Sequence, residues 1–173
     1  MALSSVVKTQ FDAGTLVVKD GTGTPLSVTM RFDNADLTIS GIQQALKETK
    51  AYQSRGKFVS LRKGPRAPLT GSFSLMLTDL SEASSGTFLD MVIGKGAFSS
   101  RVTTGRIGGD VVTFDMVWTV EGTTYGDGSD QTVELQDVEF VIDLNEGDPN
   151  TIKASFTCYG DLKVNGSTFI DVN

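Results

Sequence analysis

The residue types in this chain leave few routes to catalysis. Histidine is absent, so Ser-His-Asp and Cys-His nucleophile systems, most catalytic zinc sites and any imidazole general base are excluded. The single cysteine, Cys158, shares an apolar strand face with Ile152 and Phe156, which is typical of a buried small hydrophobe. A glycosidase needs two carboxylates roughly 5–10 Å apart in a cleft, and no pair stands out among the 21 acids. We therefore predict no catalytic residues, no cofactor and no metal.

Two short motifs could bind a ligand, and neither has the required context. The glycine-rich GRIGGD (105–110) lacks the flanking strand and helix and the lysine of a phosphate-binding loop, so we expect a surface loop. In DGSDQTVE, Asp127, Asp130 and Glu134 could supply oxygen ligands. Their spacing differs from that of a calcium-binding EF-hand loop, which favours a hairpin turn. Trp118 lies on the apolar face of its strand, and we expect it in the core rather than under a sugar.

Basic residues are concentrated in KETKAYQSRGKFVSLRKGPR, a stretch of twenty positions that holds seven of the fifteen in the chain. The seven are Lys47, Lys50, Arg55, Lys57, Arg62, Lys63 and Arg66. Residues 1–106 contain 13 basic and 8 acidic residues, a net charge of +5. Residues 107–173 contain 2 and 13, a net charge of −11, and the two halves sum to −6. Such asymmetry between halves is informative about partners.

Three interpretations of this asymmetry are open. The first is an unevenly charged surface that only contacts solvent. The second is self-association, in which the basic segment of one copy meets an acidic surface of another, head to tail. The third is nucleic-acid binding, which is disfavoured because only Tyr52 and Phe58 interleave the basic residues and the acidic remainder would repel phosphates.

Length and composition are those of one soluble globular domain. The 173 residues are 39% hydrophobic and 21% charged, enough for a single substantial core. The N-terminal residues MALSSVVKTQFDAG lack the apolar region of a secretory signal. No apolar run approaches the ~20 residues that span a bilayer, so we expect no membrane partner. One cysteine fits a reducing compartment, and we expect synthesis in a cytosol.

The elements that would position these residues are β-strands. Apolar and polar residues alternate in LSVTMRF, LTGSFSLML, VVTFDMVWTVE and TIKASFTCYGDLKV, as in a half-buried antiparallel sheet. In TVELQDVEFVIDL the apolar set changes phase, which predicts a bulge near Gln136–Asp137. In SGTFLDMVIGKG the apolar residues have helical spacing, with serines upstream for an N-cap and Gly94 and Gly96 to end the helix. We predict an all-β antiparallel sandwich or barrel with one short flanking α-helix.

The order of several local phrases resembles a known family. LTISGIQQALKETKAYQSRGKFVSLRKG is followed by PLTGSFSLMLTDL, then by SGTFLDMVIGKG with its tail AFSSRVTT, and finally by LQDVEFVIDLNEGDPNTIKASFTCYGDL. From about Leu26 to Leu162 this order is similar to that of bacteriophage tail tube (major tail) proteins. That family is related in fold to the tube proteins of type VI secretion systems and contractile pyocins.

The resemblance implies a structural virion protein without enzymatic activity. Family members self-assemble into rings, usually hexameric, which stack into a hollow conduit for DNA delivery. The implied partners are further copies of the chain, other tail proteins such as tape measure, initiator or terminator, and DNA that passes without specific binding. The implied location is the virion tail, after synthesis in the bacterial host cytoplasm. The alternative function is a non-enzymatic β-sandwich binding module, such as a virion decoration or carbohydrate-binding domain.

The resemblance also implies where two kinds of site lie. An early hairpin or loop bridges neighbouring subunits in the family, so we expect the seven basic residues to meet acidic surfaces of adjacent copies. An acidic lumen would keep DNA from adhering. Candidates among the acids of predicted strands are Asp115, Glu121, Glu134 and Glu139. We expect one domain over 1–173, with flexible arms at 1–14 and 167–173.

Overall fold

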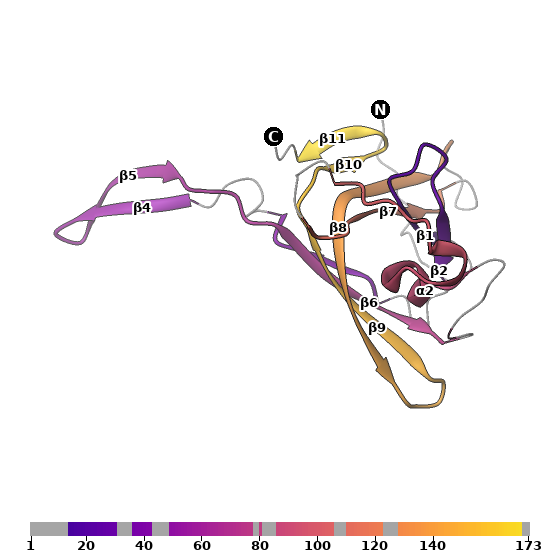
Figure 1. The fold of residues 1–173 in the computed structure, drawn as a ribbon. Helices are drawn as coiled ribbons and strands as arrows, with labels where there is room; N and C mark the ends of the chain where they lie inside the picture. The colour runs from indigo at the N-terminus through magenta and orange to yellow at the C-terminus, as the bar shows by residue number, and fades with distance from the viewer. Residues whose placement is uncertain are drawn as a thin grey trace.

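The computed structural model describes residues 14–30, 36–42, 49–77, 80, 86–105, 110–122 and 128–170. These residues form antiparallel β-sheet with one short α-helix of defined bounds, which confirms the predicted fold class (Figure 1). The strands are β1 (Gly14–Lys19), β2 (Ser27–Met30), β3 (Thr38–Ser40), β4 (Thr49–Ser54), β5 (Lys57–Lys63), β6 (Leu69–Met76), β7 (Phe114–Val120), β8 (Gln131–Asn145), β9 (Thr151–Cys158), β10 (Leu162–Val164) and β11 (Ser167–Ile170). The helices are α2 (Phe88–Ile93) and the 3₁₀ turn η1 (Gly96–Phe98).

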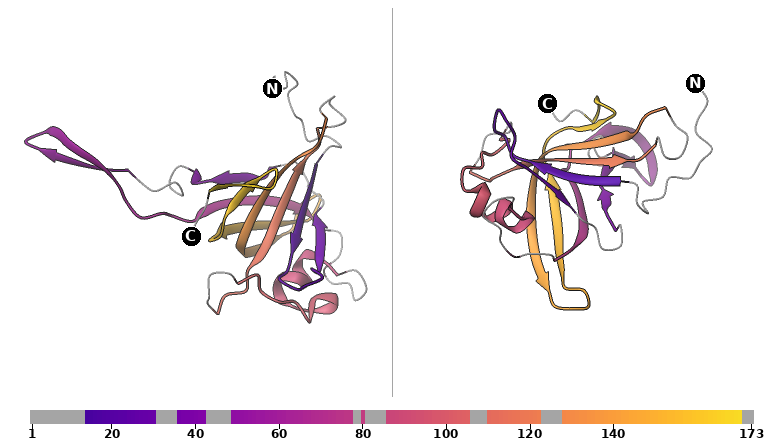
Figure 2. Two further views of the ribbon diagram at one scale, coloured as in Figure 1. Left: turned by 90° about the horizontal axis from the view of Figure 1, so that it is seen from above. Right: turned by 90° about the vertical axis from the view of Figure 1, so that its right-hand side faces the viewer.

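Two sheets are present in the described part of the chain. The larger has the strand order β2-β1-β7-β8-β9-β6-β3, with β10 and β11 attached beside β8, and the smaller is the β4–β5 hairpin. Strand β8 joins the two halves of the larger sheet. Its first half pairs with β7 and β10, and its second half, from Val138 to Asn145, pairs with β9. The β8–β9 ribbon therefore extends away from β7 (Figure 2).

Strand β8 has a bulge where its apolar pattern changes phase, as predicted. Phe114 of β7 pairs with Val138 of β8, and Met116 pairs with Leu135. An advance of two residues along β7 therefore matches an advance of three along β8, so β8 contains one extra residue. Asp137 has a left-handed backbone, with φ 53°. A bulge of this kind bends the strand and increases its twist, which allows one strand to serve both halves of the sheet.

The core is built from the alternating apolar residues of the predicted strands. Phe140 lies at its centre, with its ring centroid 5.2 Å from that of Phe88 and 5.9–6.3 Å from those of Phe73, Phe114 and Phe156. Tilted and edge-to-face pairs at these distances add to the burial energy of aromatic rings. The predicted core side chains Trp118 and Cys158 are confirmed, the first partly buried against the cluster and the second buried within it.

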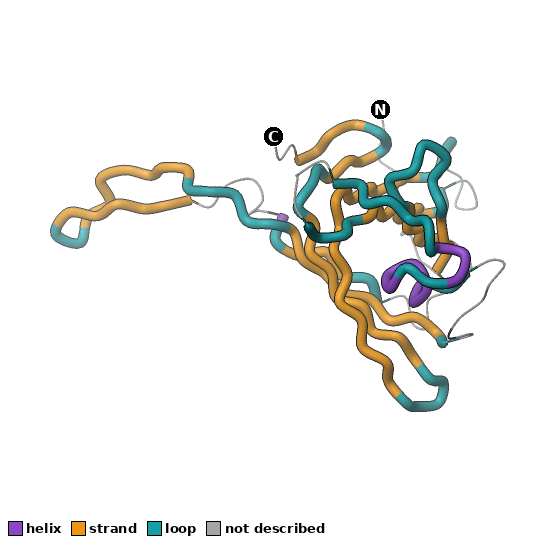
Figure 3. The backbone as a smooth tube through the Cα atoms, in the orientation of Figure 1, coloured by secondary structure: helices purple, strands orange, loops and turns teal. Residues whose placement is uncertain are grey.

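Helix α2 covers one end of this core, beside β2 (Figure 3). Its N-cap is Thr87, so the predicted serine cap is wrong. The Thr87 hydroxyl accepts a hydrogen bond from the backbone N–H of Asp90 at 3.1 Å, and the Asp90 carboxylate accepts from that of Thr87 at 3.1 Å. This reciprocal capping box needs an acid three residues after the cap. Asp90 is three residues after Thr87, which explains why Thr87 is the N-cap. The predicted end at Gly94 is confirmed, with φ 71°.

The predicted strand over TIKASFTCYGDLKV is wrong in its length, because it divides into β9 and β10. Between them, the Gly160 N–H donates to the carbonyl oxygen of Gln136 at 3.0 Å. A Cβ on Gly160 would lie 2.6 Å from that oxygen, so only glycine permits this close approach to the β8 bulge. Val112, which the alternation places on the core face of β7, precedes the strand and is exposed.

The expected terminal arms lie mostly outside the described residues. Residues 1–13 and 171–173 are not described. Within the arm expected over 167–173, Ser167–Ile170 form β11, which pairs with β10 and buries Ile170.

Candidate functional site

The β4–β5 hairpin holds most of the basic residues that the sequence singles out. Its strands are joined by the two-residue turn Arg55–Gly56, and both residues have positive φ, at 48° and 79°. Two-residue turns of this kind match the twist of the flanking strands. Residues 64–68 lead from the hairpin back to β6.

This hairpin projects from the body of the protein (Figures 1 and 2). Every residue of β4 is exposed, and Ser60 is the one residue of β5 that is partly buried. Four large apolar side chains are among those in solvent. They are Tyr52, Phe58, Val59 and Leu61, with exposed fractions of 52%, 71%, 66% and 68%. An isolated two-stranded hairpin is at best marginally stable in water, so contact with another surface would stabilise this one.

The positive charge of the chain is also concentrated here. The described residues include eight fully exposed cations, and six of them lie on the hairpin or just after it. Those six are Lys50, Arg55, Lys57, Arg62, Lys63 and Arg66. None of the six makes an ion pair within the described part of the chain. Lys47, the seventh predicted residue, lies outside the described residues.

The register gives the hairpin two different faces. Cross-strand partners share a face, so Ala51 and Leu61 lie together on one side. The other side carries Lys50 opposite Arg62. Like charges placed directly opposite each other destabilise a hairpin. An acidic group placed beside the two cations would remove that repulsion.

The four candidate lumen acids do not form one cluster. Asp115, Glu134 and Glu139 alternate with core residues on β7 and β8, so they lie on the side of the sheet away from the core. Glu121 follows the end of β7. All four are partly buried.

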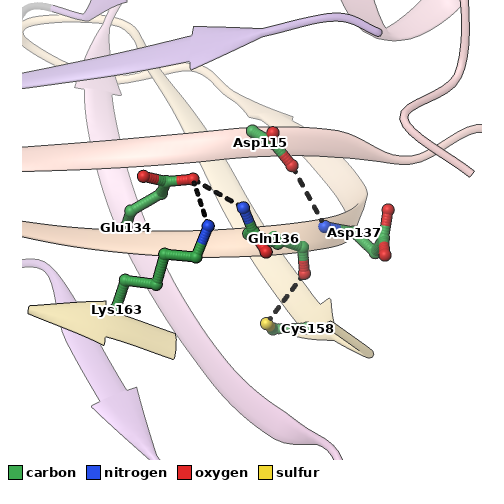
Figure 4. Close-up of polar contacts among 6 residues, drawn as sticks. All are labelled: Asp115, Glu134, Gln136, Asp137, Cys158 and Lys163. Atoms are coloured by element: carbon green, nitrogen blue, oxygen red, sulfur yellow. Dashed lines mark hydrogen bonds and ion pairs between the residues drawn. The ribbon is translucent and has the colours of Figure 1, made fainter. Parts of the chain in front are cut away.

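Asp115 and Glu134 contact polar groups near the bulge of β8. An Asp115 carboxylate oxygen accepts from the backbone N–H of Asp137 at 3.3 Å, beside the bulge (Figure 4). Glu134 accepts from the Gln136 side-chain amide at 2.7 Å and lies 3.9 Å from the Lys163 ammonium (Figure 4).

Glu139 belongs to the outer face of the β8–β9 ribbon. Its carboxylate accepts from the Tyr159 hydroxyl at 2.9 Å, and this hydrogen bond raises the pKa of Tyr159. Beside it, Thr70, Ser155 and Thr157 line part of a shallow hollow of about 240 Å³. Gly71, Val141 and Phe156 complete the lining with Glu139, and none of these residues is a buried charge.

Sequence reasoning missed the exposed end of the β8–β9 ribbon, residues 141–150, which we call the distal ribbon. Six acids are fully exposed in the described part of the chain, and three of them, Asp143, Glu146 and Asp148, lie here. Leu144 is 54% exposed beside them. The available signal is NEGDPN, whose Gly, Asp, Pro and Asn residues are typical of a turn and which carries two acids.

The remaining candidates behave as structural residues. Burial raises the pKa of the Cys158 thiol to about 12, which keeps it protonated and unreactive. Asp127 and residues 106–109 of the two weighed ligand motifs lie outside the described residues. Among the residues that are described, no group of three or more Cys, Asp or Glu side chains could hold a metal ion. In the same residues, no helix has the length and hydrophobicity needed to cross a membrane.

Comparisons with known proteins identify the fold. No family model and no curated protein matches the chain. Among solved structures, the chain is similar to the sheath/tube terminator of an extracellular contractile injection system, PVC, in its extended state. The two are 9% identical, with a TM-score of 0.56, over 94% of this chain and 99% of that one.

Two further solved structures are similar at lower scores. One is a chain of the PVC sheath-tube complex, 11% identical with a TM-score of 0.49 over 87% of each chain. The other is Hcp1 from Flavobacterium johnsoniae, 11% identical with a TM-score of 0.42 over 92% of this chain and 99% of that one. The terminator comparison shows that this chain has the fold of a component of a contractile injection system.

Proposed function

We propose that this chain is the tube subunit of a bacteriophage tail, and that it has no enzymatic activity. Copies assemble into rings, six to a ring, which stack into a hollow conduit through which DNA leaves the virion. The observation that carries the proposal is the β4–β5 hairpin, which is exposed on both faces and displays apolar side chains beside cations that make no ion pair with any described residue. In a free monomer such a hairpin exposes apolar side chains to water. In an assembly it is an arm that connects neighbouring subunits.

The ends of the larger sheet support assembly into rings. Its strand order begins at β2 and ends at β3, and among the described strands each pairs on one side only. Open edges present unpaired backbone N–H and C=O groups that can pair with another chain. When two different edges of one subunit meet in neighbouring copies, the contact is heterologous and closes into a ring if the rotation permits.

The conduit wall is proposed to carry negative charge. Asp115, Glu134 and Glu139 lie on the side of the sheet away from the core, and Glu121 follows the end of β7. Negative charge on a conduit wall would keep passing DNA from adhering. The DNA is therefore a transient cargo rather than a specific ligand. The other proposed partners are the tape measure, initiator and terminator proteins of the tail, and the proposed location is the virion tail after synthesis in the bacterial host cytoplasm.

The test is to remove the charge of the arm. Replacing Arg55, Lys57, Arg62 and Lys63 by Ser should stop tube growth, seen by electron microscopy, while the urea unfolding midpoint stays that of the unmodified protein. The control is Lys95→Ser, which removes an exposed cation outside the arm and should leave tube growth intact. Normal tubes from the fourfold variant would refute the proposed role of the arm.

A further inference from the structure

Two exposed segments in the described part of the chain carry opposite charge. Of the eight exposed cations among the described residues, six lie on the β4–β5 hairpin or just after it, and of the six exposed acids three lie on the distal ribbon. Of the other three exposed acids, two have structural partners. Asp36 accepts from the backbone N–H and the hydroxyl of Ser74, both at 2.7 Å, and Asp130 accepts from the N–H of Gly122 at 3.0 Å. Among the described residues, the distal ribbon therefore holds the largest group of exposed acids, with Lys153 of β9 directly opposite Asp143.

The same two segments also expose apolar side chains. The hairpin shows Phe58 and Leu61. At the distal ribbon, Val141 and Leu144 are 59% and 54% exposed, and Met76 on the adjoining β6 is 41% exposed. Charge complementarity alone would orient two surfaces, whereas apolar contact adds affinity that salt does not screen. The two segments match in both respects.

The hairpin does not reach the distal ribbon of its own chain. Figure 1 shows them extending in different directions from the sheet. Contacts between β4–β5 and β8–β9 are accordingly absent from the main element contacts of the described residues. A second copy of the chain is the occupant that supplies both the matching charge and the matching apolar surface.

We infer that the β4–β5 hairpin of one copy docks on the distal ribbon of the next. In this contact Lys63 faces Asp143 and Glu146, and Phe58 and Leu61, which share its face of the hairpin, pack against Val141, which shares a strand face with Asp143. This inference rests on the proposed tube subunit and names the surface that receives its arm. Because the donor and the acceptor are different patches, the contact is heterologous and can propagate from copy to copy.

Charge reversal in two separate variants tests the contact. The arm variant carries Arg62→Glu and Lys63→Glu, and the ribbon variant carries Asp143→Lys and Glu146→Lys. Each alone places like charges across every contact, and we expect association roughly 100-fold weaker than in the unmodified protein. An equimolar mixture restores opposite charges at both kinds of contact, so the mixture should assemble at close to the unmodified concentration.

Matched controls isolate the effect of position. Asp110→Lys with Ser99→Lys and Ser100→Lys changes the net charge by the same amount as the ribbon variant, at exposed positions elsewhere. This control should assemble normally. Near-ultraviolet circular dichroism should be unchanged in every variant, because all the substituted side chains are exposed.

The outcomes separate this inference from the proposed function. If the unmodified protein forms tubes but the mixture does not recover, the distal ribbon is not the acceptor and the tube proposal stands. If the two variants bind each other in sedimentation velocity while the unmodified protein forms no rings or tubes, the contact is right and the tube proposal is wrong. Recovery in the mixture, with tubes from the unmodified protein, establishes both.

Discussion

Replacing Phe58 and Leu61 by serine should weaken assembly without destabilising the monomer. Both side chains lie on the projecting hairpin, with exposed fractions of 71% and 68%. Since little of either is buried in the monomer, the free energy of unfolding should change by no more than about 0.5 kcal/mol. In the assembled state both side chains would be buried, so removing them would weaken assembly.

The size of the effect on assembly follows from the exposed area. Fully burying a Leu or Phe side chain is worth about 1.5–3 kcal/mol. Because most of each side chain is still exposed in the monomer, roughly 1–2 kcal/mol per residue remains to be gained on assembly. Loss of both would cost about 3 kcal/mol per contact, which corresponds to roughly 100-fold in the association constant.

Sedimentation velocity over a concentration series measures this change as the concentration at which large species first appear. We expect that concentration to rise roughly 100-fold for the double variant. The matched control is Phe169→Ser, which removes an aromatic side chain of similar exposure, 62%, from β11. An unchanged threshold in the double variant, or an equal shift in the control, would refute the role of the hairpin's apolar face.

Two further predictions concern the stability of the monomer. Asp20→Ala should lower the free energy of unfolding, measured in urea, by about 3 kcal/mol. The buried Asp20 carboxylate accepts hydrogen bonds from the backbone N–H groups of Leu26 at 2.8 Å and Val102 at 3.0 Å. A decrease of less than about 0.5 kcal/mol would show that these hydrogen bonds do not stabilise the fold. Cys158 should resist iodoacetamide at pH 8 in the folded protein and react once unfolded. Its pKa is raised from 9.0 to about 12 by burial, so its contribution to stability is complete below pH 9 and is lost as pH rises toward 12. Cys158→Ala should flatten this alkaline decline, and an identical decline in that variant would contradict the assignment.

The sequence predicts the sheet well because period-two alternation directly reports which face of a strand is buried. Phe73, Phe140 and Phe156 are all placed in the core by that pattern, and the phase change near Asp137 predicts the β8 bulge. The division of β9 from β10 is not readable in the same way. It depends on the approach of Gly160 to the bulge in β8, a contact between segments distant in sequence.

The candidate site is only half visible in the sequence. The basic hairpin is apparent as a run of cations in consecutive segments. Its acidic counterpart is dispersed among 13 acids of the C-terminal part, and composition does not separate Asp143 and Glu146 from structurally engaged acids such as Asp137. Burial and hydrogen bonding make that distinction, and both arise only in the folded chain.

Electron microscopy of the purified protein, beside its mass in solution over a concentration series, tests the proposed tube subunit most directly. The proposal predicts rings with a central hole that stack into tubes as concentration rises, and a threshold that increases with salt because the arm is charged. A protein that keeps the mass of a single chain throughout the series, with no rings in the images, would contradict it.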